Sequence, residues 1–353
     1  MTMTNSMKNA RSINTGNTNT ASQLWFTAPF EVEVRHVPLP EPAKGEVRVR
    51  THYSAVSTGT ELLLYRGQLP QSMALDSSLH SLQESSRYPV QYGYACAGEI
   101  EHLGDGVDQA WLGQRVFSFQ PHASHFVARP EQLIAVPDDV PAEAAVFLPS
   151  METVVNLVQD GHPMIGERVV VLGQGVVGLL LSGVLAQHPL ATLSAVEGLP
   201  DRQALARKMG AQAVFDPADA TAEKQPTLAN TDLIYEVSGH PVALDLAIEL
   251  TGFGSRIVIG SWYGNKPVTV DLGGKAHRNR LQIITSQVST LAPALTGRWD
   301  KQRRFELAWD MIRRIDPTQL ITNTATLHEA QGLYQQLHEA RSGIVQALFH
   351  YPD

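Results

Sequence analysis

The chain has 353 residues, too many for one ordinary hydrophobic core, so two domains are favoured. The formal net charge of -8 and the lack of a dense lysine or arginine run argue against a nucleic-acid-binding surface. The single cysteine, Cys96, excludes a disulfide framework or a multi-cysteine zinc site within one chain and favours the cytoplasm.

Residues 1–23 are polar and rich in Thr and Asn, with no apolar core of the kind found in signal peptides, so we predict a disordered leader. The uncharged run 169–186 has about the minimum length of a membrane span. Its glycines cluster where a buried strand would turn into a buried helix, and a continuous span has no need for them there. We therefore expect a strand and a helix in this run, and no membrane association.

Residues 24–150 are expected to form a β-rich domain. Segments such as 45–57 and 88–104 alternate apolar and polar residues between Pro and Gly breaks, which is typical of short strands. Residues 66–88 are polar and irregular, which indicates a loop or flap.

Residues 151–292 are expected to form a doubly wound parallel sheet. Apolar strands rich in Val and Ile alternate with helical segments, after a first helical pattern over 140–160 that has Pro141 in its first turn. Such alternation predicts βαβ units. After the last strand, within 280–289, come a basic helix and a short tail, so residues 293–353 are predicted to return to the β-rich domain. The predicted fold class is therefore α/β plus β.

Three glycines, Gly173, Gly175 and Gly178, follow a predicted strand and open a predicted helix, the context that a GxGxxG spacing requires. The first permits a tight turn, the second lets the backbone approach a diphosphate, and the third packs the helix against the strand. The anion would lie on the free N–H groups at Val176 and Val177, where the helix dipole favours negative charge by roughly 0.3–2 kcal/mol.

Glu197 ends the next predicted strand about twenty residues after the glycines, where a carboxylate binds a ribose diol in dinucleotide sites. It would repel a 2′-phosphate, so NAD(H) is favoured over NADP(H). Arg202 lies nearby and leaves NADP(H) open, because it could pair with Glu197 or cover the adenine. The alternative interpretation is a glycine-rich turn with an ordinary surface glutamate.

Six stretches together resemble the medium-chain dehydrogenase/reductase family, and the resemblance covers residues 24–350. The stretches are VSTGTE (56–61), YGYACAGEI (92–100), GQRV (113–116), VVVLGQGVVG (169–178), VEGLPDRQALARKMGA (196–211) and YEVSG (235–239). The resemblance implies a GroES-like catalytic domain, a Rossmann domain and a return of the chain to the first domain. Within the family, residues 56–67, 148–160 and 277–289 most resemble a zinc-free branch related to bacteriochlorophyllide a dehydrogenase, which oxidises a hydroxyethyl side chain to an acetyl group.

The residues at the family's zinc positions are not metal ligands. Thr58 stands where zinc members carry Cys, and Tyr94 stands where they carry His after a glycine. The third ligand falls near Leu148 or Pro149, and the four-cysteine structural lobe is missing. We therefore expect no zinc, and in its place hydrogen-bond donors that stabilise negative charge developing on a carbonyl oxygen.

Five side chains are the catalytic candidates. By the resemblance, Thr60 matches a hydroxyl that relays protons, and Tyr94 brings a phenol to a former ligand position. Glu61 is a candidate base or orienting group, Glu152 a carboxylate near the expected pocket, and His122 a residue of the segment that should line the substrate cleft. Each of four candidates also has a purely structural explanation. Glu61 could bond only to backbone amides in its turn, and Glu152 could be an ordinary acid in the first turn of a helix. His122 could lie in a surface loop, and Tyr94 could serve only in packing. A metal site of Glu61, Glu152 and His122 also remains open.

The resemblance also implies which residues hold the nicotinamide end of the cofactor. Ser238 and Gly239 should contact the ribose. Gly260, Ser261 and Ser286 should offer backbone groups to the carboxamide.

The leading hypothesis is a zinc-independent oxidoreductase that transfers a hydride between NAD(H) and a small-molecule alcohol or ketone. The alternatives are an NADPH-dependent enone or quinone reductase and a non-catalytic dinucleotide-binding protein. The resemblance implies a homodimer in which residues 280–285 pair edge to edge across a twofold axis. We expect a cytoplasmic protein that binds neither nucleic acid nor membrane.

Overall fold

The computed structural model describes residues 19–69, 86–339 and 343–352. Most of the predicted leader and most of the predicted loop over 66–88 lie outside these ranges. The leader prediction was too long, because strand β1 (Thr20–Ala28) includes residues 20–23. These residues belong to the fold because β1 pairs along its length with β2 (Glu31–Pro38), Thr20 lying opposite Pro38.

A seven-stranded sheet organises the β-rich part of the chain, in the order β14-β15-β3-β4-β5-β7 with β6 paired to β3. Its last strand in sequence, β15, pairs antiparallel with β3, so that Leu348 lies opposite Ala55. The strands are β3 (Val47–Ala55), β4 (Cys96–Leu103), β5 (Arg115–Ser118), β6 (His125–Ala128), β7 (Ile134–Ala135), β14 (Ile321–Ala325) and β15 (Gln346–His350).

A six-stranded parallel sheet organises the other part, in the order β10-β9-β8-β11-β12-β13. Its strands are β8 (Arg168–Leu172), β9 (Thr192–Val196), β10 (Ala213–Phe215), β11 (Thr231–Glu236), β12 (Thr251–Ile259) and β13 (Gln282–Thr285). This order confirms the predicted doubly wound sheet. It reverses at β8 and β11, and such a switch point leaves a crevice for a ligand beyond the carboxyl ends of the strands.

The uncharged run 169–186 folds as predicted, with β8 followed by helix α4 (Val176–Leu185). Within the described ranges, every helix is too short or too polar to cross a bilayer. The strands of this sheet carry buried side chains on both faces, as parallel strands covered by helices do: Val169, Val170 and Val171 are all almost fully buried.

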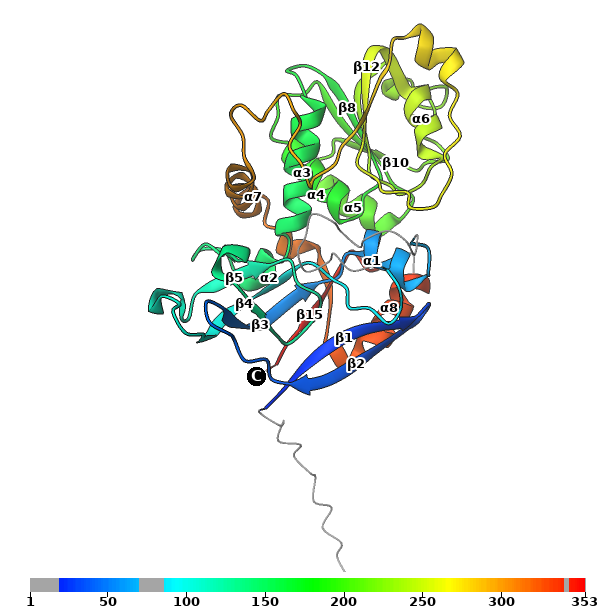
Figure 1. Ribbon diagram of the computed structural model, residues 1–353. Helices are drawn as coiled ribbons and strands as arrows, with labels where there is room; N and C mark the ends of the chain where they lie inside the picture. Colours follow the sequence, from blue (N-terminus) through cyan, green and yellow to red (C-terminus); the bar gives the residue numbers. More distant parts are fainter. Residues whose placement is uncertain (1–18, 70–85, 340–342, 353) are drawn as a thin grey trace, which may run out of the picture.

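The helical pattern over 140–160 is split into two helices, α2 (Ala142–Ala145) and α3 (Leu148–Gly161). Helix α3 crosses the predicted domain boundary at residue 150, so it belongs to both parts of the molecule (Figure 1). The basic helix α7 (Lys301–Ile315) lies beside α3 and packs against α3 and α4 (Figure 1). The bounds of the remaining helices are α1 (Thr58–Tyr65), α5 (Pro200–Lys208), α6 (Ala243–Leu250) and α8 (Ala330–Glu339).

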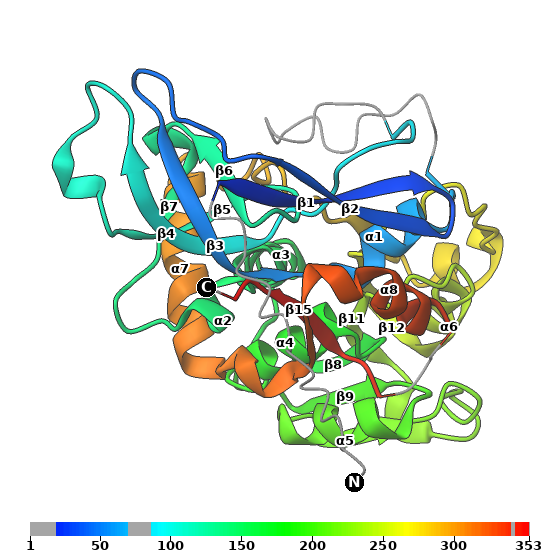
Figure 2. The same cartoon turned by 90° about the horizontal axis from the view of Figure 1, so that it is seen from below.

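Several elements of the β-rich part had no counterpart in the sequence prediction, among them α1, β14, α8 and β15. Helices α1 and α8 pack against each other next to the β1–β2 ribbon (Figure 2). Tyr65 of α1 and Tyr334 of α8 stack with ring centroids 5.4 Å apart. The return of the chain therefore adds both a helix and strands to the β-rich part.

Candidate cofactor and active site

The glycine turn after β8 has the close backbone contacts and the open space that a dinucleotide-binding turn requires. Gly173 has a positive φ of 93°, and a Cβ there would lie 2.5 Å from Cα of Ser238. A Cβ on Gly178 would lie 2.0 Å from the carbonyl oxygen of Gly173. Neither position accepts a side chain. A Cβ on Gly175, in contrast, would meet nothing within 4 Å, so open space lies before the helix.

Helix α4 begins at this open space. Gly175 is its N-cap and offers no side chain, so the cap leaves the first backbone N–H groups without a side-chain acceptor. The first turn consists of Val176, Val177 and Gly178, as predicted from the sequence. Free N–H groups at a helix N-terminus, next to room that a side chain does not fill, are suited to a diphosphate.

Glu197 follows β9 and lies against the glycine turn. Its Oε2 accepts a hydrogen bond from the backbone N–H of Gln174 at 2.8 Å, and its Oε1 accepts one from Leu199 at 3.0 Å. The side chain is largely buried rather than on the surface, with an exposed fraction of 9%. Gln174 is also fixed, because its Oε1 accepts a hydrogen bond from Ser182. The carboxylate is therefore held at the edge of the glycine turn.

Arg202, the other residue predicted near the adenosine, lies on α5. Its guanidinium donates a hydrogen bond to the backbone carbonyl of Ile344 at 3.1 Å. Ile344 precedes β15, so this contact joins the parallel-sheet part to the β-rich part. The interaction occupies one of the five N–H donors of the guanidinium.

The turns after β11 and β12 are joined through Glu236, which is fully buried. Its Oε1 accepts a hydrogen bond from the Ser238 backbone at 2.8 Å, and its Oε2 accepts one from the Tyr263 hydroxyl. Burial and the adjacent Glu236 carboxylate raise the pKa of Tyr263, so this phenol stays a donor. The Gly239 N–H donates to Ser261 Oγ at 2.8 Å, which brings the two predicted nicotinamide turns together.

Gly260 and Ser286 complete this group of predicted cofactor residues. The Gly260 N–H donates to the Glu236 carbonyl at 2.9 Å, and a Cβ on Gly260 would lie 2.8 Å from Leu157 of α3. Ser286 follows β13, and its N–H donates to the carbonyl of Ile259. The carboxyl ends of β11, β12 and β13 therefore place all five predicted residues at one edge of the sheet.

Three hydroxyl groups meet at the start of α1. The Tyr94 hydroxyl donates a hydrogen bond to Ser57 Oγ, and it lies 3.2 Å from Thr60 Oγ1. All three side chains are partly exposed. The structure thus brings together Thr60 and Tyr94, the two hydroxyl candidates from the sequence, and adds Ser57.

The hydroxyl-bearing helix also lies against a cofactor loop. A Cβ on Gly264, in the loop after β12, would lie 3.6 Å from Leu63 of α1 and 3.7 Å from the carbonyl of Gln68. This contact places the second half of α1 and the residues that follow it beside the loop after β12.

His122 does not lie on the surface of a substrate cleft as predicted, and Glu61 fits the predicted alternative of a turn contact rather than that of a base. Both side chains are fully buried, and His122 Nε2 lies 3.1 Å from Glu61 Oε2. The opposite ring nitrogen of His122 lies 2.7 Å from Ser54 Oγ, and the Tyr334 hydroxyl donates to Glu61. Because Glu61 Oε1 accepts from the Ser57 N–H at 2.6 Å, the carboxylate supports the start of α1.

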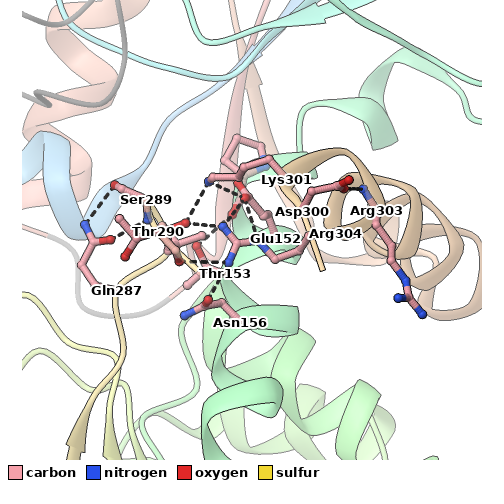
Figure 3. A network of polar contacts seen from close by, with 12 residues as sticks. Glu152, Thr153, Asn156, Gln287, Ser289, Thr290, Asp300, Lys301, Arg303 and Arg304 are labelled. Carbon is pink, nitrogen blue, oxygen red and sulfur yellow. Dashed lines mark hydrogen bonds and ion pairs between the residues drawn. The ribbon is translucent and has the colours of Figure 1, made fainter. Parts of the chain in front are cut away.

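Glu152 was also predicted to face the substrate, and the structure assigns it another contact (Figure 3). Its Oε1 accepts hydrogen bonds from Arg304 at 2.7 Å and from Lys301 at 2.8 Å, both on α7. The Glu152 carboxylate therefore forms ion pairs that link α3 to α7. A carboxylate with two cationic partners is unsuitable as a general base. Sequence reasoning missed this because Glu152 and Arg304 are 152 residues apart, and such a pairing has no local signal.

The alternative metal site of Glu61, Glu152 and His122 is not assembled. Within the described parts of the chain, no three His, Cys, Asp or Glu side chains are arranged to hold a metal ion. The residues at the family's zinc positions, Thr58 and Tyr94, offer a hydroxyl and a phenol. This donor set does not fit zinc, which binds thiolate, imidazole and carboxylate groups.

Three residues with clear roles in the geometry were missed from the sequence, namely Ser57, Glu236 and Arg304. Ser57 and Glu236 lie inside stretches that carried the family resemblance, so their motif position was a usable signal. Arg304 is one of several basic residues in α7, and only its complete burial separates it from them.

Two family models match the chain. The alcohol dehydrogenase GroES-like domain matches residues 43–134, and the zinc-binding dehydrogenase model matches residues 177–310. The (R,R)-butanediol dehydrogenase of Bacillus subtilis is 25% identical over 285 residues, which cover 72% of this chain and 79% of the relative. The galactitol 1-phosphate 5-dehydrogenase of Escherichia coli is 22% identical over 253 residues, covering 62% and 73%.

Solved structures share the fold at lower identity. The alcohol dehydrogenase rspB from Escherichia coli, solved with NADH, superposes with a TM-score of 0.77 at 19% identity, covering 94% of this chain and all of that one. A protein from Sinorhizobium meliloti, solved with NADP, gives a TM-score of 0.76 at 17% identity, covering 94% and 99%. With its GroES-like and Rossmann domains, the chain belongs to the zinc-type medium-chain dehydrogenase/reductase superfamily of NAD(P)-dependent oxidoreductases.

Proposed function

We propose that this chain is a zinc-independent dehydrogenase that uses NAD(H) to interconvert an alcohol and its carbonyl compound. The observation that carries the proposal is the hydroxyl group of Tyr94, which stands where zinc relatives carry a ligand and is held with the hydroxyl groups of Thr60 and Ser57. When bound, the nicotinamide cofactor supplies or accepts the hydride. The chain's own residues must bind it, orient it and manage charge and protons on the substrate oxygen.

The cofactor is assigned to the carboxyl edge of the parallel sheet. The diphosphate fits the open space at Gly175 and the free N–H groups that begin α4. Each oxygen of Glu197 keeps a lone pair after its backbone hydrogen bond, so the carboxylate retains capacity for ribose hydroxyls. A negative charge at this position disfavours a 2′-phosphate, which supports NAD(H) over NADP(H).

We assign the binding position of the substrate oxygen to the three hydroxyl groups that meet at the start of α1. During carbonyl reduction, negative charge grows on that oxygen and requires a positioned donor. Thr60 Oγ1 and Tyr94 Oη are within hydrogen-bond distance of each other, and Tyr94 Oη already donates to Ser57 Oγ. In reduction, a proton from solvent, passed along these three partly exposed oxygens, would reach the substrate oxygen; in oxidation, the proton would leave to solvent by the reverse path.

The homodimer predicted from the resemblance remains part of this proposal. Strand β13 is the edge strand of the parallel sheet, paired on one side with β12. Its side chains are mostly exposed, and Ile283 is 41% exposed. An exposed strand edge of this kind favours pairing with a second copy.

The experiment combines metal analysis with the variant Tyr94→Phe. We expect purified protein to oxidise alcohols with NAD, with less than stoichiometric zinc and no loss of turnover in a chelator. The substitution removes the hydroxyl and keeps the ring, so kcat should fall about 10²-fold or more while NADH affinity stays unchanged. Tyr65→Phe is the matched control, because this α1 hydroxyl contacts Gln331 and should leave kcat unaltered.

Different results would favour other assignments. Tightly bound stoichiometric zinc, or full turnover by the Tyr94→Phe variant, contradicts the hydroxyl mechanism. Tighter binding of NADPH together with turnover of enones or quinones identifies the alternative reductase. Binding of NADH without turnover on alcohols, aldehydes, enones or quinones indicates a dinucleotide-binding protein.

A further inference from the structure

A buried ion pair joins helices α3 and α7 (Figure 3). Arg304 of α7 is fully buried, and both its Nε and one terminal nitrogen donate to Glu152 Oε1, at 3.0 and 2.7 Å. Its other terminal nitrogen donates to Asn156 Oδ1 at 2.6 Å. We call Glu152, Asn156, Lys301 and Arg304 the α3–α7 hub.

The hub holds the loop that follows β13, residues 286–290. Arg304 donates to the backbone carbonyls of Val288 and Thr290, the latter at 3.3 Å. Lys301 donates a second hydrogen bond to the Val288 carbonyl at 2.9 Å. Asn156 Nδ2 donates to Ser286 Oγ at 2.8 Å. The hub therefore contacts the beginning, the middle and the end of this loop.

The hub holds the loop through backbone carbonyls, in addition to contacts within the loop. Within residues 286–290, the side chain of Gln287 makes local hydrogen bonds to Ser289, only two residues away. The planar guanidinium of Arg304, in contrast, has fixed donor directions, and its pairing with a buried carboxylate leaves it little freedom. A buried Arg without its carboxylate would be strongly unfavourable, so the pair stays formed.

We propose that Arg304, paired with Glu152, is a positioning residue that fixes the loop 286–290 against the nicotinamide end of the cofactor. This inference rests on the proposed function, because it takes the carboxyl end of β13 as part of the cofactor site. Ser286 N–H bonds to the Ile259 carbonyl, so the loop begins beside the turn that carries Gly260 and Ser261. Arg304 acts only through the loop, since its side chain is fully buried.

Binding of two ligands distinguishes a positioning role of Arg304 from a general contribution to the stability of the protein. NADH carries the nicotinamide, and ADP-ribose carries the adenosine, the diphosphate and the second ribose without it. The test variant is the double substitution Glu152→Gln with Arg304→Met, which removes both charges together and leaves no buried charge unpaired. By calorimetry or fluorescence titration, we expect the Kd for NADH to rise about tenfold and the Kd for ADP-ribose to stay within about twofold.

The matched control is the double substitution Glu167→Gln with Arg256→Met. Arg256 lies 2.6 Å from Glu167 and is also largely buried, but this pair lies by the amino end of β8, away from the loop. It should leave the Kd for both ligands within about twofold of the natural protein. If the first double variant does not fold, Ser286→Ala removes only the contact with Asn156 and should raise the NADH Kd alone, by about threefold.

Equal weakening of both ligands in the hub variants, or unchanged NADH binding in them, overturns the positioning role. Failure of the natural protein to bind either ligand overturns the proposed function itself, and the inference with it. A selective loss of NADH affinity in the hub variants, with the control unchanged, supports the proposal.

Discussion

At the residue scale, the proposed preference for NAD(H) rests on Glu197. The carboxylate is fixed by two backbone N–H groups, so it cannot turn away from a ligand that lies on the glycine turn. Glu197→Gln keeps the side chain's size and removes its charge. We expect the ratio of the NADPH Kd to the NADH Kd to fall by about tenfold or more, since the repulsion of a 2′-phosphate is lost. Fluorescence titration with both nucleotides measures the ratio.

Glu223→Gln is the control for that measurement, because Glu223 is exposed in the same domain. It should leave the ratio unchanged. A ratio that stays constant in the Glu197→Gln variant would mean that other groups, such as Arg202, govern the choice.

The sequence could place single residues where one motif fixes both type and position. The structure has Glu197 beside the glycine turn and Tyr94 beside Thr60, as motif spacing suggested, while their roles stay predictions. Glu152 and His122 were misjudged, since their partners Arg304 and Glu61 come from distant segments. A carboxylate or imidazole has the same local sequence signature whether it faces a substrate or a buried partner.

At the element scale, the three glycines of the turn before α4 differ in whether they could accept a side chain. Gly175 has a φ of −72°, which alanine adopts readily, and open space around its missing Cβ. Gly175→Ala should therefore fold normally, but its methyl group would occupy the room for the diphosphate. We expect the Kd for NADH to rise about tenfold or more, with the melting temperature unchanged.

Gly332→Ala on α8 is the matched control, because its added methyl group also meets nothing within 4 Å. It should stabilise the protein by about 0.5–1 kcal/mol and leave NADH binding as it was. Normal NADH affinity in the Gly175→Ala variant would place the diphosphate elsewhere.

Elements with strong periodicity were predicted, and those that depend on tertiary contacts were not. The βαβ units from β8 to β13 carry apolar strands and clear helix ends, such as Gly210 with its positive φ. Helix α1, by contrast, has only eight residues, too few for a clear helical periodicity. It is held by Glu61 and by packing on α8, neither of which is visible locally.

At the scale of the whole molecule, the proposed dimer is testable through β13. Ile283→Lys places a charge on the exposed edge strand, where it would oppose pairing with a second copy. Light scattering after size-exclusion chromatography should show a dimer for the natural protein and a shift to monomer for the variant. A dimer that persists in the variant would assign the interface to another surface.

The position of β15 constrains the order in which the molecule can form. Residues 346–350 supply a strand that lies between β14 and β3, and Phe349 within it is fully enclosed. During translation, the parallel sheet has all its strands once residue 285 has emerged, whereas the other sheet still lacks an inner member. The parallel-sheet part can thus assemble on the ribosome before the other sheet is complete, because residues 53–55 of β3 have no β15 to pair with until residue 350 has emerged.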